Sequence, residues 1–175
     1  MSKHEASDNS AWIRSAVAEH EDKLLRYARR LTGCRDRAGD VVQDVFLRLC
    51  RQERSEVEGH LAEWLYTVCR RRAIDVGRKE NTMKTASADV QSQADTSPNG
   101  EAVAIQREET DQVEAALSTL SDNQQEVIRL KFQHGLSYRE IAGVTELSVS
   151  NVGYLIHTAI GNIRRQLRVD TELAP

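Results

Sequence analysis

The sequence Gly135-Leu-Ser-Tyr-Arg-Glu-Ile-Ala-Gly-Val-Thr-Glu-Leu-Ser-Val-Ser-Asn-Val152 predicts two helices joined by a brief turn. Ser137 and Glu140 have the spacing of a capping box, in which a hydroxyl and a carboxylate satisfy backbone amides at the start of a helix. Ser148 stands where the N-cap of the second helix would be. The small Ala142 lets the two helices cross closely, so the stretch indicates a helix-turn-helix.

A further helix precedes this motif and a long one ends it. Ser121 and Gln124 form another capping box, and Gly135 follows where that helix would end. The apolar residues of this helix are Val127, Ile128, Leu130 and Phe132. After Ser148, apolar residues recur at helical spacing and are expected to face the core. They are Val149, Val152, Leu155, Ile156, Ile160, Ile163 and Leu167.

Polar side chains lie off this apolar stripe. A helix fits the major groove of DNA with its N-terminal residues nearest the base edges, and Asn pairs well with adenine. We therefore expect residues 111–168 to form a DNA-binding domain; the alternative is an ordinary helical hairpin with a solvated polar face. The candidate contacts are Ser148, Ser150, Asn151, Tyr154, His157, Thr158, Arg164 and Arg165.

Residues 11–80 predict a separate bundle of three to four helices. Apolar residues recur at helical spacing in segments that begin near Ala11, Ala38 and Val57. In the first segment they are Ile13, Val17, Leu24, Ala28 and Leu31, and in the second Ala38, Val41, Val42, Val45, Phe46 and Leu49. The second segment turns Asp40, Gln43, Asp44 and Arg48 outward. The third ends in a basic run with a local charge of +4 over residues 64–79, which contains Arg70, Arg71, Arg72, Arg78 and Lys79 against Asp75.

Residues 81–110 lose this periodicity and are rich in Ser, Thr, Gln and Asp, with a local charge of −4 over 81–111. They predict a flexible acidic linker that spans roughly 25–30 Å. The fold class is therefore all-α, with two small helical domains joined by a linker. The net charge of −3 averages over basic and acidic parts, so it does not argue against nucleic acid.

The bulk composition excludes several classes of protein. No apolar run is long enough for a membrane span or a signal peptide, which favours a cytoplasmic protein with no membrane partner. The three cysteines are widely spaced and the histidines lack metal-ligand spacing, so we expect free thiols, no metal and no cofactor. Asp40 and Asp44 share a helix face without a third acidic ligand nearby, so an enzyme is not expected.

Two blocks resemble a known family. Asp40-Val-Val-Gln-Asp-Val-Phe-Leu-Arg-Leu49 is similar to the polymerase-docking helix of bacterial extracytoplasmic-function (group four) sigma factors, within the sigma-70 family. Trp64-Leu-Tyr-Thr-Val-Cys-Arg-Arg-Arg-Ala-Ile-Asp75 resembles their promoter-melting helix, and Leu117 to Leu167 resembles their region four. The resemblance covers about Leu24 to Leu167.

This resemblance implies a promoter-specificity factor without covalent chemistry. Asp40, Gln43, Asp44 and Arg48 would hold core RNA polymerase. The basic run from Arg70 to Lys79, Asp75 included, would meet the minus-ten region, while nearby residues capture an unstacked base, and the helix after Ser148 would read the minus-thirty-five element. The resemblance further implies a monomer when free, with promoter DNA and core polymerase as partners. An anti-sigma factor is a further partner that the family commonly has.

The sequence also departs from the family. Family recognition helices usually carry several Lys or Arg residues in their middle, where this chain has Gly153, Leu155, Thr158 and Ile160. Loss of phosphate contacts predicts weak binding of the isolated chain to DNA. Trp64 shares a stripe with Leu61 and Val68, which favours a place in the core over base stacking. A stand-alone helix-turn-helix regulator is the alternative function.

Overall fold

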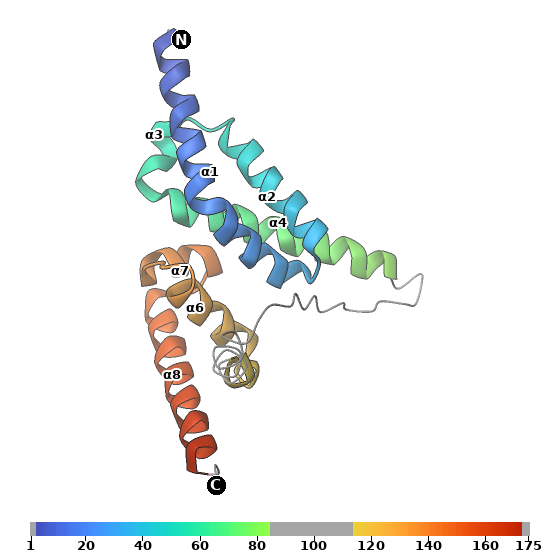
Figure 1. Ribbon diagram of the computed structural model, residues 1–175, viewed down its shortest axis with the longest axis vertical. Helices are drawn as coiled ribbons and strands as arrows, with labels where there is room; N and C mark the ends of the chain where they lie inside the picture. Colours follow the sequence, from blue (N-terminus) through green and yellow to red (C-terminus); the bar gives the residue numbers. More distant parts are fainter. Residues whose placement is uncertain (1–2, 85–113, 173–175) are drawn as a thin grey trace, which may run out of the picture. The chain divides into compact units, whose positions relative to one another are not determined.

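The structure is a computed structural model that describes residues 3–84 and 114–172, with side chains within 8–78 and 114–167. Every regular element in these ranges is helical, which confirms the all-α class. The chain divides into two compact units, residues 1–92 and 93–175 (Figure 1). Apart from residues 81–84, the expected linker lies outside the described residues. Among the helices described, none is both long and apolar enough to cross a membrane.

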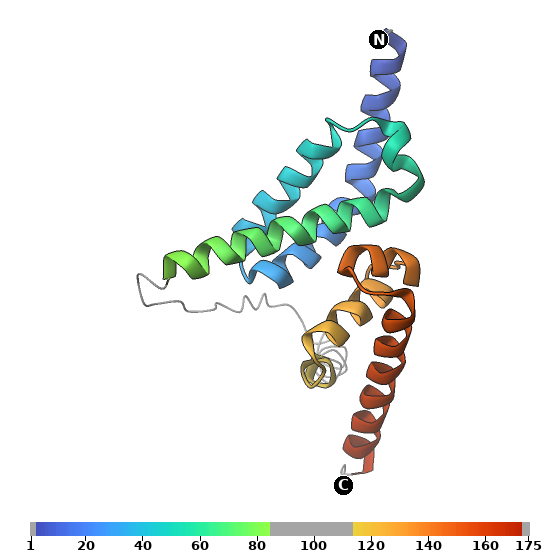
Figure 2. The same cartoon turned by 180° about the vertical axis from the view of Figure 1, so that it is seen from behind.

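The first unit is built on three long helices that pack against one another. They are α1 (Lys3–Thr32), α2 (Arg35–Leu49) and α4 (Leu61–Lys84), and each contacts the other two (Figures 1 and 2). The expected third segment is not one continuous helix, because α3 (Arg54–Val57) and the 3-10 helix η1 (Glu58–His60) come before α4. Val57 is buried and anchors this short connection.

The core of the first unit follows the predicted pattern in α2. Ala38, Val41, Val42, Val45 and Leu49 are buried as expected, whereas Phe46 is half-buried. In α1 the pattern was less accurate, because the helix also buries polar and aromatic residues that an apolar stripe omits. His20 is buried there, and the ring of Tyr27 contacts that of Tyr66 edge-on at 5.2 Å between centroids.

The second unit contains α6 (Asp122–Phe132), α7 (Tyr138–Thr145) and α8 (Val149–Glu172), with a further helical turn at residues 114–118. Both predicted capping boxes are confirmed. Ser121 Oγ accepts from the Gln124 amide at 3.4 Å, and Ser137 Oγ accepts from the Glu140 amide at 3.3 Å. Gly135 has a φ of +77°, the left-handed conformation that favours glycine at the end of α6.

Two apolar residues predicted to lie in helix cores are exposed instead. Val149, the first residue of α8, is 49% exposed, and Phe132, the last of α6, is 62% exposed. A residue at a helix end lacks a helical turn on one side, the preceding turn for Val149 and the following turn for Phe132, so periodicity overestimates burial there. An ion pair with a buried arginine was not predicted at all: Arg129 is 6% exposed and donates to both carboxylate oxygens of the exposed Glu114, at 3.2 and 2.9 Å.

Candidate polymerase and nucleic-acid interfaces

The helix-turn-helix is held together by a small apolar wedge. Ile141 of α7 and Val152 of α8 are fully buried, and Ala142 is 9% exposed at the crossing, as predicted. Glu146 turns the chain between the two helices in the left-handed conformation, with a φ of +60°. These contacts fix the direction in which α8 points, which a helix that reads base edges requires.

Ser148 is the N-cap of α8. Its Oγ accepts a hydrogen bond from the Asn151 amide at 3.2 Å, so its hydroxyl sets the start of the helix. The next predicted contacts lie one turn apart along a single solvent face. Ser148, Ser150, Asn151, Tyr154, His157, Arg164 and Arg165 are exposed, and Thr158 is half-buried. The face therefore joins the predicted residues, with Tyr154 at its centre, 67% exposed.

An aromatic contact behind this face was missed from the sequence. Gly153 lacks a side chain, and a Cβ there would stand 3.7 Å from Cε2 of Tyr138. The Lys131 ammonium lies 5.5 Å from the centre of the same ring and donates to the Leu136 carbonyl at 3.2 Å. The ring of Tyr138 thus connects α6, α7 and α8. The signal was available, because a glycine inside a helix often marks a close approach.

On α2, the predicted docking residues surround an apolar one. Asp40, Gln43 and Arg48 are exposed, and Asp44 is half-buried. Leu47 is 51% exposed and falls between them on the helix surface, since residues three and four apart share a face. Sequence reasoning considered only the polar residues of this face, so it missed Leu47.

Asp44 also bonds within the unit. Its Oδ2 lies 3.0 Å from Arg48 Nε on the same helix and 3.3 Å from Arg72 Nε on α4. The structure therefore places one predicted polymerase contact beside one predicted DNA contact.

On α4, the predicted residues do not all share one face. Arg71, Asp75 and Arg78 are exposed one turn apart, with Ile74 40% exposed among them. Arg70 and Arg72 are half-buried to either side. The Lys79 side chain lies outside the described residues. Trp64 is half-buried in the first turn of this helix.

A helix-turn-helix with an exposed polar recognition face, together with a second helical unit that carries exposed arginines, defines a helical DNA-binding protein. Comparison with known families is more specific. Residues 16–82 match the family described as Sigma-70 region 2, and residues 110–162 match Sigma-70 region 4. The chain is 31% identical to the ECF RNA polymerase sigma factor SigL of Mycobacterium tuberculosis over 169 residues, 93% of either protein. The chain belongs to the sigma-70 family, in its ECF group.

Other similar proteins are sigma factors as well. SigX of Bacillus subtilis, an ECF RNA polymerase sigma factor, is 27% identical over 86% of this chain and 80% of its own length. The sigma factor RpoE of Bartonella quintana, solved with the anti-sigma factor NepR, shares the fold with a TM-score of 0.68 at 24% identity, over 90% of this chain and 97% of that one. CnrH, solved with the cytosolic domain of CnrY, has a TM-score of 0.61 at 25% identity, over 94% and 93%. The chain acts in promoter-specific transcription initiation by RNA polymerase.

Proposed function

We propose that three exposed faces have separate roles in initiation. The face of α2 docks on core polymerase, that of α4 opens the minus-ten region and that of α8 reads the minus-thirty-five element. The observation that carries this proposal is that each face is solvent-exposed while the apolar residues of the same helix are buried beneath it. Such a helix can offer its polar face to a partner without any change in its own core.

The docking face of α2 combines charge with an apolar centre. Leu47 would be buried by the polymerase, and Asp40 and Gln43 would form the polar surround that fixes orientation. Interfaces of this kind have an apolar core and a polar rim. Asp44 supports the face from within the unit, since its carboxylate pairs with Arg48 and Arg72.

The exposed face of α4 suits separated DNA strands. Arg71 and Arg78, about two helical turns apart, can meet separate phosphates, while Ile74 offers an apolar surface between them. Unstacking a base costs a few kcal/mol, which contacts with the opened strand must recover. No step on this surface makes or breaks a covalent bond, and we propose that the protein is not an enzyme.

The recognition helix has an uncharged reading face. Between Val149 and Ile163 it contains no Lys or Arg, and its exposed centre is Asn151 and Tyr154. Phosphate contacts dominate the affinity of proteins for DNA, so this helix alone should bind weakly. Tight binding would require the polymerase complex, which holds both units on one promoter.

We further propose a cytoplasmic protein, monomeric when free, that is held inactive by an anti-sigma factor. The solved relative RpoE is seen in complex with the anti-sigma factor NepR and CnrH with the cytosolic domain of CnrY, and the folds of both match this chain. It would act in the cytoplasm, because its proposed partners, core polymerase and promoter DNA, are found there.

Run-off transcription tests the proposal directly. Purified core polymerase is incubated with a genomic promoter library, with and without this chain. We expect discrete transcripts only when both proteins are present. The competing function, a stand-alone helix-turn-helix regulator, would instead give no new transcript and a dimer bound to operator DNA without polymerase.

A further inference from the structure

The run with the largest net positive charge in the described residues lies outside the three faces discussed so far. Residues 23–37 carry a local charge of +5, which exceeds the +4 of the basic run on α4. The preceding turn is acidic, with Glu19, Glu21 and Asp22, so the two signs separate along α1. The cations are Lys23, Arg26, Arg29, Arg30, Arg35 and Arg37, against Asp36.

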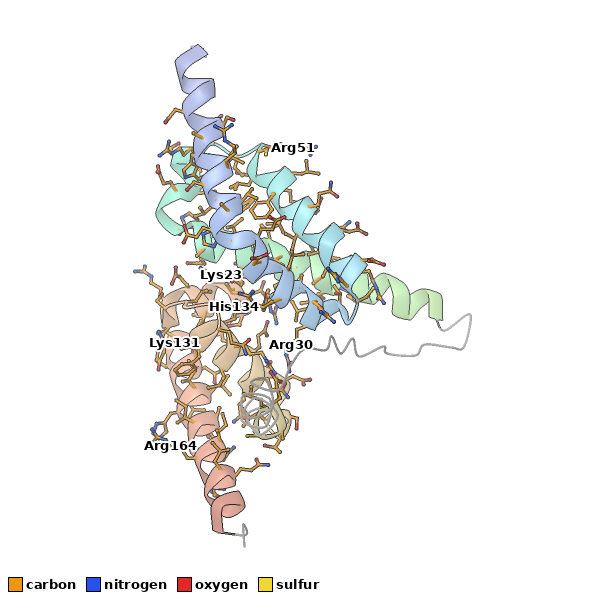
Figure 3. All side chains as sticks on the ribbon, viewed as in Figure 1. Lys23, Arg30, Arg51, Lys131, His134 and Arg164 are labelled. Atoms are coloured by element: carbon orange, nitrogen blue, oxygen red, sulfur yellow. The ribbon has the colours of Figure 1, made fainter. Side chains whose placement is uncertain are left out.

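The fold gathers these cations around the turn between α1 and α2. Gly33 reverses the chain with a φ of +64°, which brings the first turn of α2 next to the last turn of α1. The Arg30 side chain lies at this end of the hairpin, whereas Arg51 lies at the opposite end (Figure 3). We call the exposed members the turn arginines: Arg26, Arg29, Arg30 and Arg35.

Helix stability accounts for only part of this arrangement. Arg29 and Arg30 occupy the last turn of α1, where a cation is favoured by the helix dipole. Arg35 and Arg37 occupy the first turn of α2, where the same dipole disfavours a cation. Hydrogen bonds from Arg37 to the Cys34 thiol lower the pKa of that thiol, as an electropositive environment would.

Helix α1 packs on α4 close to Arg26. Arg26 stands beside Tyr27, whose ring packs on Tyr66 of α4, one turn before Arg70. Burial raises the pKa of the Tyr66 hydroxyl, whereas the positive charge of Arg26 acts to lower it, so Arg26 lies within electrostatic reach of α4.

We propose that the turn arginines form a second phosphate-binding surface for promoter DNA, next to α4. This proposal rests on the proposed function of α4. DNA fits the surface better than a protein partner does, because the cores of protein interfaces are depleted of charge, whereas DNA interfaces are strongly positive. The turn arginines leave no exposed large apolar residue among them.

The test uses holoenzyme assembled from core polymerase and the full chain, on a forked promoter found by run-off transcription. Arg29→Gln with Arg35→Gln is compared with Arg14→Gln and Arg51→Gln, which removes the same charge from exposed residues at the other end of the hairpin. Binding is measured from 50 to 300 mM KCl. Each lost phosphate contact lowers the slope of log affinity against log salt by about 0.7 to 0.9.

We expect the Arg29 and Arg35 variant to lose between one and two units of slope and the control pair to keep the wild-type slope. Arg29→Lys with Arg35→Lys should restore the slope, which shows that charge and not folding is measured. Equal slopes in both Gln pairs overturn the inference, and so does a loss of polymerase affinity at unchanged slope. If the wild-type holoenzyme neither transcribes nor binds the promoter, the proposed function fails as well.

Discussion

Arg72 of α4 lies against Asp44 of α2, with its Nε 3.3 Å from the carboxylate Oδ2. Arg48 approaches the same oxygen to 3.0 Å. One residue assigned to polymerase and one assigned to DNA are therefore partners inside the first unit. Replacing Asp44 with Arg would place three guanidinium groups together, so that substitution cannot separate docking from folding.

A double-mutant cycle should measure this ion pair. With both side chains about one-third exposed, Asp44→Asn and Arg72→Gln should show a coupling free energy of about 0.2 to 1 kcal/mol in unfolding. Both tryptophans, Trp12 and Trp64, belong to the first unit, so urea unfolding followed by their fluorescence reports on this unit alone. Additive effects of the two substitutions would show that the pair contributes no net stability to the first unit.

Substitutions elsewhere on α2 can test docking cleanly. Asp40 is exposed and Leu47 is half-exposed, so Asp40→Arg and Leu47→Ala should leave the fold intact. Each should weaken binding to core polymerase by about tenfold, which is about 1.4 kcal/mol, as expected for a lost apolar anchor or a reversed charge. Glu21→Arg, exposed on α1, is the control. Wild-type affinity of both α2 variants in a pull-down would contradict the docking assignment.

Opening of the promoter should depend on the exposed arginines of α4. Arg71→Ala with Arg78→Ala should slow strand separation by tenfold or more, while the formation of the closed complex changes less, because only the opened strand uses this face. Permanganate reactivity of unpaired thymines measures the step. Arg72→Ala is a poor substitute, because it also breaks the pair with Asp44. Unchanged footprints for the double variant would remove α4 from the melting step.

Local sequence signals predicted the second unit well. Both capping boxes, the glycine at the end of α6 and the serine that starts α8 act within a few residues, so the sequence contains the whole interaction. The buried stripe of α2 could be predicted for the same reason, since residues three and four positions apart lie on the same face of a helix.

Contacts between distant residues could not be predicted in this way. Arg129 pairs with Glu114, fifteen positions away, and Arg72 with Asp44 on another helix, and neither spacing marks a pair. The run of three arginines, Arg70 to Arg72, predicted one basic surface. Consecutive residues of a helix point in different directions, however, so the three side chains lie on three different sides of α4. The role of Leu47 could not be predicted, because a single apolar residue outside the buried stripe of α2 has no meaning in the sequence until the docking face is known.

Gly153 offers a test of packing behind the recognition face. A Cβ there would stand 3.7 Å from Tyr138 Cε2, an ordinary van der Waals distance, so Gly153→Ala should fit. It should stabilise α8 by up to about 1 kcal/mol, the difference in helix propensity. Hydrogen exchange of the α8 amides measures this gain. Gly161→Ala, with nothing within 4 Å, is the matched control, and a gain at that position alone would show that the Tyr138 ring is seated more tightly.

His20 should make the first unit sensitive to acid. It is 8% exposed, and burial lowers the pKa of its imidazole, an effect that outweighs the exposed Glu19 carboxylate 3.7 Å away; Lys23 also acts to lower the pKa. The folded state therefore binds fewer protons than the unfolded state, whose histidine titrates near pH 6.5. The stabilisation is therefore complete above about pH 6.5 and decreases as the pH falls below it.

We expect the free energy of unfolding, followed by tryptophan fluorescence in urea, to decrease between pH 7.5 and pH 5. His20→Gln should lower the stability at pH 7.5 if packing suffers, but it should also flatten the pH dependence, which a packing defect alone would leave unchanged. His157→Gln, exposed on α8 in the other unit, should keep the wild-type slope. If the His20 variant retains the full pH dependence, the acid sensitivity arises from other groups, and the buried imidazole is not its source.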